Sequence, residues 1–293
     1  MKLQERVPLA KLTTLGTGGP ARWLGTPETE DELVEMLAWA RSEGLPVAVV
    51  GLGSNLLAAD EGFDGVVLKL AGELARAEAI DGRVVAGGGA PLAVCLHRAR
   101  SADLGGLEFV CAIPGTVGGA VKMNAGAYGA DMASVLVRAK VAGPVGVAWR
   151  TPAELGLSYR RSALGAGEVV AGGELRGTPA RAEDIKATVR DMQSRRKEAQ
   201  PTNKRTFGSV FKNPEHELTA GRMLEACGLR GFRVGGAQVS PKHANFIENA
   251  GEARSEDAIA LIAEARRRAR ERFGVVLEPE VQLLGRIEIP SLG

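Results

Sequence analysis

The chain has 293 residues, of which 45% are hydrophobic and 25% are charged, an ordinary globular composition that is long enough for two or three packed domains. Its 37 Lys and Arg against 35 Asp and Glu give a formal net charge of +2, so no global charge recruits nucleic acid or a membrane surface. The N-terminal stretch lacks the apolar run of a signal peptide, and no later stretch is apolar enough to cross a bilayer.

The cysteines and histidines are scattered along the chain. Cys95, Cys111 and Cys227 form neither a CxxC spacing nor a paired pattern, which is typical of a reducing compartment. The three histidines show no ligand spacing, so we expect no structural metal. The sequence therefore predicts a cytoplasmic protein without a metal, nucleic-acid or membrane partner.

The first third of the chain predicts alternating helices and short strands. Residues 29–43 predict a helix, because acidic residues crowd its first turn and apolar residues recur on one face. A buried strand is expected at residues 46–50, directly before the sequence GLGSNLL. Residues 65–70 and 83–89 predict two more strands, and residues 91–100 a second helix with a proline at its start.

The rest of the chain begins with glycine-rich loops and short apolar runs at residues 104–173. Residues 180–200 predict a charged helix that the next proline ends, and we expect a domain boundary near there. A short helix is predicted at residues 219–227, and a last strand at 274–285. Alternating strands and helices of this kind indicate an α/β or α+β enzyme with more than one domain.

A long amphipathic helix is predicted at residues 255–273. Ser255 is its expected N-cap, and Gly274 is expected to end it. Its run ARRRARER has two interpretations, a nucleic-acid contact or a solvated basic face whose apolar residues turn inward. The second is favoured, because the chain as a whole carries almost no net charge.

The sequence GLGSN at residues 51–55 is a candidate phosphate loop. Glycines after a buried strand let successive backbone N–H groups approach an anion. The loop is not a dinucleotide fingerprint, since Leu56 stands where a third glycine is needed, and it is not a Walker loop. Taken alone, it could equally be a tight turn.

A second glycine-rich stretch is more distinctive. Residues 113–120 read IPGTVGGA and residues 124–129 read NAGAYG. Five glycines and a proline in this span argue against a stable helix or a regular strand. A cofactor laid along the stretch would hold it in place, whereas the alternative is a structural loop of several turns. Residues 14–20, TLGTGGP, are similar but less specific.

These three motifs, GLGSNLL, IPGTVGGA and NAGAYG, resemble the FAD loops of the UDP-N-acetylenolpyruvoylglucosamine reductase (MurB) family. The resemblance covers nearly the whole chain. It implies an α+β protein whose FAD-binding fold resembles that of vanillyl-alcohol oxidase (PCMH-type), with a C-terminal α+β substrate-binding domain. The implied FAD-binding subdomains are residues 1–66, joined by the C-terminal strand 275–293, and residues 67–180. The implied substrate-binding domain is residues 190–274.

The resemblance also implies which residues bind FAD. All of them lie in the three glycine-rich motifs, and the pyrophosphate is expected on backbone amides rather than on a Rossmann helix. They are Gly51, Leu52, Gly53, Ser54, Asn55, Leu56, Pro114, Gly115, Thr116, Val117, Gly118, Gly119, Asn124, Gly126 and Ala127.

Three further motifs, YRRS, GSVFKNP and EPEV, imply the catalytic set Arg160, Ser209 and Glu280. Taken singly, each residue has an ordinary interpretation as a surface charge, a turn residue or an exposed strand residue. By resemblance, NADPH reduces the flavin, which passes hydride to the β-carbon of an enolpyruvyl ether. The negative charge that develops calls for fixed donors such as Arg160 and a protonated Glu280, and Ser209 is the implied proton donor.

The substrate is a UDP-sugar, so its diphosphate needs polar contacts. Lys212 and Asn213 match substrate-contacting positions of the family, and Lys212 could also assist Ser209. His243 and Asn245, in SPKHANF, are further candidates, although His243 could equally be a satisfied histidine in a turn. Tyr159 in the YRRS motif is the fifth candidate. The sixth is Tyr128, which could instead anchor a core through one hydrogen bond.

Two departures from the family pattern affect the substrate site. Thr206 and Phe207 precede Gly208 where smaller residues are expected. The short stretch between Tyr159 and Ser209 indicates the second class of these reductases, which lacks the tyrosine-loop insertion. A monomer is expected. Two alternatives stay open: an oxidase of the same fold acting on a small hydroxy compound, and a non-catalytic nucleotide-binding protein.

Overall fold

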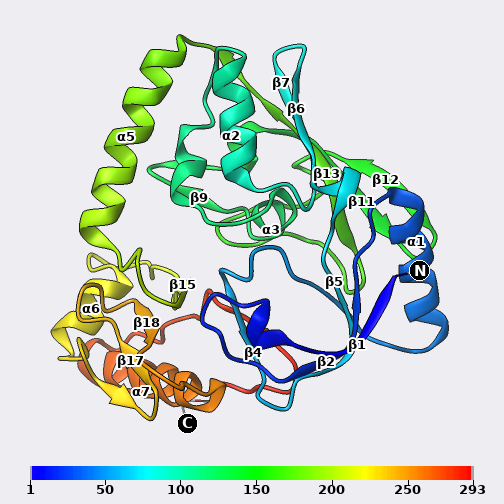
Figure 1. Cartoon of the computed structure of the whole chain (residues 1–293). Helices are drawn as coiled ribbons and strands as arrows, with labels where there is room; N and C mark the ends of the chain where they lie inside the picture. Colours follow the sequence, from blue (N-terminus) through cyan, green and yellow to red (C-terminus); the bar gives the residue numbers. More distant parts are fainter. Residues whose placement is uncertain (1, 292–293) are drawn as a thin grey trace. The chain divides into compact units, whose positions relative to one another are not determined.

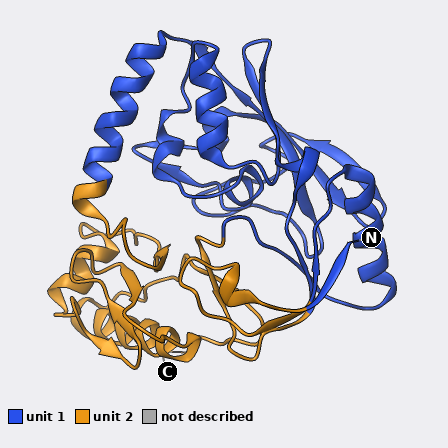
Figure 2. Ribbon diagram, in the orientation of Figure 1, with its two compact units in different colours: residues 1–5, 23–52, 65–196 blue, residues 6–22, 53–64, 197–293 orange. Residues whose placement is uncertain are grey.

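The computed structural model describes residues 2–291. The chain forms two compact units, shown in two colours in Figure 2. Unit 1 comprises residues 1–5, 23–52 and 65–196, and unit 2 comprises residues 6–22, 53–64 and 197–293. Each unit therefore combines segments that are distant in the sequence. Within residues 2–291, no helix is both long and apolar enough to cross a membrane.

Helix α1 (Glu30–Ser42) in unit 1 confirms the first predicted helix (Figure 1). The Thr29 hydroxyl accepts a hydrogen bond from the Glu32 N–H at 3.3 Å, and three acidic residues occupy the positive end of the helix. Its buried face is as expected: Leu33, Met36, Leu37 and Ala40. That face belongs to a hydrophobic cluster completed by strand residues such as Val66 and Val169.

The strand before the GLGSN motif is shorter and more exposed than predicted. β3 (Val47–Val49) pairs in parallel with β5 (Phe63–Leu68), in a sheet of order β1-β2-β5-β3 that also includes β1 (Leu3–Pro8) and β2 (Pro20–Gly25). Val49 is 38% exposed, and only Val50, beyond the strand end, is fully buried. The predicted strand is therefore present over Val47–Val49 but is not buried, because the apolar run ends beside an open cavity rather than inside a core.

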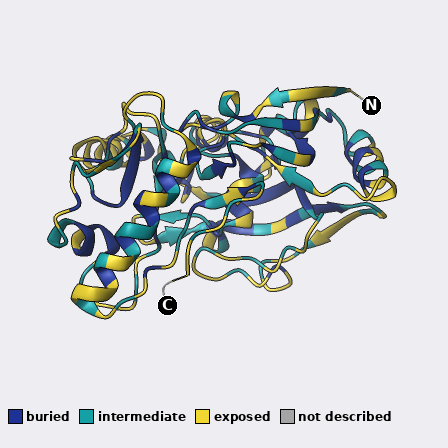
Figure 3. Ribbon diagram, turned by 90° about the horizontal axis from the view of Figure 1, so that it is seen from below, coloured by how far each residue is buried: buried dark blue, intermediate teal, exposed yellow. Residues whose placement is uncertain are grey.

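The second sheet of unit 1 has five antiparallel strands. Its order is β12-β11-β13-β7-β6, and α2 and α3 pack against it. The strands are β12 (Gly146–Arg150), β11 (Leu136–Gly143), β13 (Val169–Arg176), β7 (Arg83–Gly87) and β6 (Ala77–Ile80). The helices are α2 (Leu92–Ser101) and α3 (Val117–Lys122). Seven of the eight residues of β13 are buried. Figure 3 colours the buried residues of the chain dark blue.

Short elements connect these sheets in unit 1. They are η2 (Gly72–Ala75), β8 (Leu104–Gly105), η3 (Glu108–Ala112), β9 (Gly126–Ala127), β10 (Ala130–Asp131), α4 (Met132–Val135) and β14 (Thr178–Pro179). The charged helix predicted at residues 180–200 is present as α5 (Ala182–Ala199), in which Ile185 is the buried residue.

Unit 2 is built around an antiparallel sheet covered by two helices. The sheet order is β15-β18-β17-β16, and a separate parallel pair joins β4 to β19. The strands are β15 (Thr206–Ser209), β18 (Phe246–Asn249), β17 (Ala237–Val239), β16 (Arg233–Val234), β4 (Leu56–Ala58) and β19 (Gln282–Leu284). The helical elements are η1 (Leu9–Lys11), α6 (Ala220–Ala226) and α7 (Ser255–Phe273).

Helix α7 has the predicted length, but its N-terminus differs. Arg254 is the N-cap, and Ser255, the predicted cap, is the first helical residue, with its hydroxyl bonded to the carbonyl of Ala58. Gly274 ends the helix as expected, with a left-handed φ of 68°. The basic run supports the solvated-face interpretation, since Arg267 and Arg268 both pair with Glu264.

The predicted last strand is mostly absent. Only β19 forms, and Glu280 lies before it in an extended segment where Pro279 makes a single bridge to Phe211. Residues 278–280 instead bond the segment 210–212, through the N–H of Lys212 to the carbonyl of Glu278 and the N–H of Glu280 to the carbonyl of Val210, so they pair outside β19. The placement of Glu280 in the final strand is therefore wrong.

Candidate functional site

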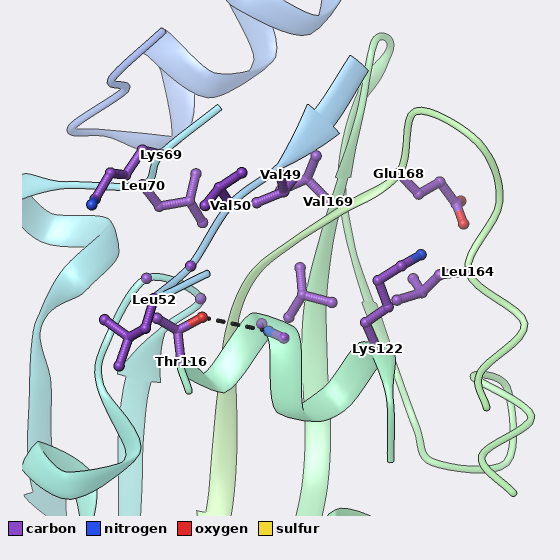
Figure 4. Close-up of a pocket in the computed structure, with 16 residues that line it drawn as sticks. Val49, Val50, Leu52, Lys69, Leu70, Thr116, Lys122, Leu164, Glu168 and Val169 are labelled. Atoms are coloured by element: carbon purple, nitrogen blue, oxygen red, sulfur yellow. Dashed lines mark hydrogen bonds between the residues drawn. The ribbon is translucent and has the colours of Figure 1, made fainter. Parts of the chain in front are cut away.

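A cavity of about 110 Å³ in unit 1 lies where β3 runs into the GLGSN motif (Figure 4). Five of the predicted FAD residues line it: Gly51, Leu52, Thr116, Gly118 and Gly119. The other lining residues are Val49, Val50, Lys69, Leu70, Gly88, Gly89, Lys122, Leu164, Glu168, Val169 and Val170.

The glycines of this cavity are required by close backbone approach. A Cβ at Gly88 would lie 1.8 Å from the carbonyl oxygen of Val170, and a Cβ at Gly51 would lie 2.5 Å from the hydroxyl of Thr116. At Gly115, by contrast, a Cβ would meet nothing within 4 Å. Contacts inside the protein therefore do not explain why position 115 is a glycine, whereas a ligand laid along the loop would explain it.

Helix α3 corrects the expectation that the IPGTVGGA stretch holds no stable helix. Thr116 is its N-cap, and its hydroxyl accepts from the N–H of Gly119 at 3.5 Å (Figure 4). The N–H of Gly118 donates to the carbonyl of Gly88 at 2.7 Å, which fixes the first turn against β7 and β13. Tertiary packing therefore outweighs the low helix propensity of the two glycines.

Charged side chains surround one side of the cavity. Lys122, Leu164 and Glu168 lie near one another in Figure 4, and Lys69 lies on the opposite side. Glu168 accepts a hydrogen bond from Arg150 at 3.0 Å, and this pairing lowers the pKa of the Glu168 carboxyl. The cavity combines an apolar lining with the charges of Lys69, Lys122 and Glu168, and its two lysines suit a nucleotide cofactor that carries phosphates.

Arg160 is held in an unusual backbone conformation in the same unit. Its φ is +55°, in the left-handed region that non-glycine residues seldom adopt, and such residues cluster at functional sites. Its guanidinium donates to the carbonyl of Gly126 at 2.9 Å and lies 5.0 Å from the ring of Tyr159. The structure thus brings Arg160 together with the predicted FAD residue Gly126.

Asn124 explains how these two loops are joined. Its side chain is almost fully buried, and its amide donates to Asp131 at 2.9 Å and to the carbonyl of Ser158 at 3.1 Å. Its carbonyl accepts from the N–H of Ala133 at 2.8 Å. The side chain therefore orders the NAGAYG loop beside the turn that carries Arg160.

The two predicted tyrosines are both exposed. Tyr159 is 54% exposed and Tyr128 is 43% exposed, and the Tyr128 hydroxyl donates to the carbonyl of Met192 in α5 at 2.6 Å. Partial burial raises the pKa of the Tyr128 phenol above its ordinary value. Their roles as substrate contacts stay predictions.

The remaining residues of the GLGSNLL motif belong to unit 2. Gly53 has a φ of +67°, and a Cβ there would lie 1.9 Å from the carbonyl of Leu12. The Asn55 amide donates to the carbonyl of Glu280 at 3.2 Å. A Cβ at Gly208 would lie 3.2 Å from the carbonyl of Ser54, so the GSVFKNP motif runs directly beside this loop.

Two of the three predicted catalytic residues come together in unit 2. The N–H of Glu280 donates to the carbonyl of Val210, the residue after Ser209, at 2.8 Å. The N–H of Lys212 donates to the carbonyl of Glu278 at 2.9 Å, and Phe211 bridges to Pro279. The GSVFKNP and EPEV motifs are therefore neighbours, although they are some seventy residues apart in sequence.

Lys212 and Asn213 make contacts that the sequence did not reveal. The Lys212 ammonium forms an ion pair with Glu278 at 2.6 Å, where the lysine is 16% exposed and the glutamate 68% exposed. The side-chain carbonyl of Asn213 accepts from the N–H of Ala220 at 3.1 Å, at the start of α6. Lys212 is thus fixed by the first glutamate of the LEPEV segment.

A second cavity of about 280 Å³ lies entirely in unit 2 and includes His243. Arg222, Arg230 and Lys242 supply positive charge, and the full lining is Glu198, Ala199, Thr219, Gly221, Arg222, Glu225, Arg230, Lys242, His243 and Ala244. Burial, followed by the nearby Arg230, lowers the pKa of His243, so its ring stays neutral at pH 7. Glu225 pairs with Arg230 at 3.1 Å and with Arg222 at 3.7 Å, and Glu198 also lines the cavity, so the three basic side chains outnumber the acidic ones by one, a modest excess that favours an anion.

Asn245 lies beside this cavity but does not line it. Its side chain is 4% exposed, and its amide bonds both the N–H and the carbonyl of Phe211. Its role as a substrate contact stays a prediction. No sequence pattern pointed to Asn245 as a partner of Phe211, nor to Arg222, Arg230 and Glu278, because each of these contacts joins distant segments.

Comparisons with known proteins agree with this arrangement. Residues 22–151 match the FAD binding domain family, and residues 200–284 match the UDP-N-acetylenolpyruvoylglucosamine reductase C-terminal domain family. A UDP-N-acetylenolpyruvoylglucosamine reductase 2 from Symbiobacterium thermophilum is 45% identical, with 97% of this chain and 92% of that protein covered. The reductase of Syntrophotalea carbinolica is 44% identical, with 95% and 93% covered. The crystal structure of the reductase (MurB) from Thermus caldophilus has a TM-score of 0.84 and 39% identity, with 97% and 99% covered.

Proposed function

Because the chain belongs to the UDP-N-acetylenolpyruvoylglucosamine reductase (MurB) family, it is an FAD-dependent reductase of peptidoglycan precursor synthesis, and we propose that Arg160, Ser209 and Glu280 act together in its reduction step. The predicted fold is confirmed: a PCMH-type FAD-binding domain is followed by the MurB C-terminal domain. The substrate is the enolpyruvyl ether of UDP-N-acetylglucosamine, and the product is UDP-N-acetylmuramate. The cofactors are FAD and NADPH.

FAD would be held by the loops that line the first cavity. The close approach of Gly88 and Gly51 to neighbouring backbone and side chains fixes the shape of these loops, and the open surface at Gly115 has room for a ligand. Lys69 and Lys122 add positive charge for a cofactor with a pyrophosphate. When bound, FAD takes a hydride from NADPH and supplies it to the β-carbon of the enolpyruvyl group.

The residues of this chain would complete the reduction by handling charge and one proton. Negative charge develops at the α-carbon and in the substrate carboxylate as the β-carbon gains hydride. Arg160 would donate hydrogen bonds to that carboxylate, and Glu280 would donate one if it is protonated. Fixed donors of this kind typically lower a barrier by roughly 3–4 kcal/mol each. Ser209 would then transfer its hydroxyl proton to the α-carbon and regain a proton from solvent.

One observation supports this set more than any other. The 2.8 Å hydrogen bond from the Glu280 N–H to the carbonyl of Val210 ties the EPEV segment to the residue next to Ser209. A proton donor and a carboxyl group that serve one carbon must lie side by side, and this tie is what their joint action requires. Lys212 follows Ser209 closely in the GSVFKNP motif and pairs with Glu278. Its positive charge would make the serine hydroxyl a better acid.

The UDP part of the substrate would bind in the second cavity. Arg222, Arg230 and Lys242 provide charge for a diphosphate, and neutral His243 can donate from one ring nitrogen while the other accepts from the Asn245 N–H at 3.2 Å. The charge balance of this cavity supports a nucleotide better than an apolar ligand. Tyr128, Tyr159 and Asn213 are proposed as further contacts.

Several finer properties are proposals that rest on the sequence. We propose the second class of these reductases, because the stretch between Tyr159 and Ser209 is short. We propose residues 1–66 with 275–293, residues 67–180 and residues 190–274 as the functional domains. A monomer that works in the cytoplasm, where UDP-sugars and NADPH are supplied, completes the proposal.

An absorbance experiment on the purified protein tests the proposal. The protein should be yellow, and NADPH should bleach its flavin band under anaerobic conditions. Addition of the enolpyruvyl UDP-sugar should restore the band and form one equivalent of product. A protein that binds no flavin, or whose reduced flavin is reoxidised by oxygen but not by this substrate, would contradict it.

A further inference from the structure

Asn245 makes four hydrogen bonds, and three of them fix the segment after Ser209. Its side-chain carbonyl accepts from the N–H of Phe211 at 3.0 Å, and its side-chain amide donates to the carbonyl of Phe211 at 2.9 Å. Its backbone carbonyl accepts from the N–H of Val210 at 2.9 Å. Its own N–H donates to the Nδ1 of His243 at 3.2 Å, which fixes Asn245 from the other side.

This pattern continues the strand pairing beyond its normal end. β15 ends at Ser209, which pairs with Phe246, and the next pairing residue would be Asn245. Its backbone bonds Val210, and its amide then pairs with both backbone groups of Phe211, as a neighbouring strand residue would. The side-chain amide of Asn245 thus takes the place of backbone hydrogen bonds at the point where the strand pairing ends.

The segment is also held from its opposite edge. The carbonyl of Val210 accepts from the Glu280 N–H, and the N–H of Lys212 donates to the carbonyl of Glu278. Residues 210–212 therefore lie between Asn245 and the EPEV motif. Loss of the side-chain amide would free both backbone groups of Phe211 on the Asn245 edge, while the backbone bond to Val210 and the bonds to the EPEV motif remain.

We propose that Asn245 is a positioning residue for the proton transfer: it holds the backbone next to Ser209 so that the serine hydroxyl and Glu280 keep their relative placement. This rests on the proposed role of Ser209. The side chain is 4% exposed, and both ends of its amide are engaged by Phe211, so it acts through that backbone rather than by touching substrate.

A role of Asn245 as a substrate contact and a role as a positioning residue predict different kinetics. A substrate contact mainly changes the affinity for substrate. A positioning residue leaves affinity unchanged and slows the step whose atoms it aligns, and a shift of about 1 Å can slow such a step on the order of 100-fold. Flavin reduction by NADPH does not use the serine proton, so it should be spared.

Asn245→Asp and Asn245→Ala provide the test, in the full chain with FAD bound. Asn245→Asp keeps the shape and the acceptor but replaces the donor to Phe211 with an oxygen. Asn249→Ala is a matched control, because the Asn249 amide donates to the carbonyl of Leu15 at 3.0 Å in the same unit but does not contact residues 209–212. Ser209→Ala is measured beside them.

The two half-reactions are followed separately by anaerobic stopped-flow absorbance. For both Asn245 variants we expect FAD content, NADPH reduction and substrate Kd within about twofold of wild type. Reoxidation by substrate should slow about 10- to 100-fold. The solvent deuterium isotope effect on that step should increase, because proton transfer becomes more limiting. Asn249→Ala should lower the melting temperature without changing this step.

Three outcomes would overturn the inference. Reoxidation within twofold of wild type in folded Asn245→Asp would overturn it, and so would a slower reaction explained entirely by weaker substrate binding. An equal slowing in Asn249→Ala would show a general loss of stability instead. Normal reoxidation of Ser209→Ala would contradict the proposed role of Ser209 as proton donor. Slow reoxidation of Ser209→Ala with normal reoxidation of the Asn245 variants would contradict only the positioning role of Asn245.

Discussion

The side-chain amide of Asn55 donates to the backbone carbonyl of Glu280 at 3.2 Å, and the N–H of Gln282 returns to the carbonyl of Asn55 at 3.0 Å. These two bonds join the GLGSNLL loop, a predicted FAD contact, to the motif that carries a predicted catalytic carboxyl. The cofactor loop and the catalytic motif are therefore fastened to each other within unit 2. A change at Asn55 should affect both.

Asn55→Ala should weaken FAD binding and slow substrate reduction together. Loss of one such hydrogen bond costs about 0.5–1.5 kcal/mol, so we expect roughly a two- to tenfold increase in the FAD Kd. Flavin fluorescence titration of the apoprotein measures the first effect, and kcat measures the second. Asn249→Ala, which removes a similar bond to the carbonyl of Leu15, is the control. Unchanged FAD affinity in Asn55→Ala would count against the shared role.

Gly115→Ala should separate folding from cofactor binding. A Cβ at Gly115 would meet nothing within 4 Å in the protein, so the variant should fold with a melting temperature of the apoprotein close to that of wild type. If FAD lies on this loop, the added methyl should weaken FAD binding at least about fivefold, because a misplaced methyl group in a tight contact costs on the order of 1–3 kcal/mol.

Gly143→Ala serves as the matched control, since Gly143 also has open space around its Cβ and lies at the end of β11. This variant should bind FAD as wild type does. Equal FAD affinities for the Gly115 and Gly143 variants would remove the IPGTVGGA loop from the cofactor site.

Glu278→Gln should affect substrate handling through Lys212. The ion pair measures 2.6 Å, and Glu278 is 68% exposed, so the pair contributes no more than about 1 kcal/mol and the KM for substrate should rise by up to about fivefold. NADPH reduction of the flavin should be unchanged. Steady-state kinetics with each substrate varied in turn measures this difference. Glu271→Gln, which breaks a surface pair with Arg267, is the control, and an identical result for both variants would refute the role of Glu278.

Glu264 should make the stability of the protein sensitive to acid. Hydrogen bonds from Arg267 and then Arg268 lower the pKa of its carboxyl from 4.5 to about 2. Because the folded-state pKa lies below the unfolded one, the unfolded chain binds more protons in this range. The stabilisation is complete above about pH 4.5 and is lost as the pH falls towards 2.

Glu264→Gln should therefore lower the melting temperature at pH 7 by about 2–4 °C for each kcal/mol lost. The difference between variant and wild type should shrink steadily below pH 4.5. Thermal unfolding followed by circular dichroism at a series of pH values measures it. A difference that stays constant down to pH 2.5 would show that the carboxylate charge is not the source of the stabilisation.

Local signals in the sequence predicted the helices well. Thr29, followed by acidic residues, correctly predicted where α1 begins, and Gly274 predicted where α7 ends. Both predictions hold because a helix cap acts within one turn of its own residue. Ser255 shows the limit of such signals, since its hydroxyl bonds Ala58, a residue almost two hundred positions away. A sequence pattern cannot distinguish a cap from such a tertiary contact.

The candidate site was predictable only as separate motifs. The family motifs pointed to Ser209 and Glu280, but nothing in either motif shows that the Glu280 N–H bonds the carbonyl of Val210. Asn245 was expected to contact substrate, whereas its amide is occupied by the backbone of Phe211. Long-range backbone pairing decides such roles, and it becomes visible only when the fold is known.

Ser209→Ala provides the most direct test of the central claim that this serine delivers the proton to the α-carbon. The variant should bind FAD, and NADPH should bleach its flavin at close to the wild-type rate. Reoxidation by the enolpyruvyl UDP-sugar should then be slower by two orders of magnitude or more, on the order of what a general acid contributes. Reoxidation of Ser209→Ala at the wild-type rate would contradict the account.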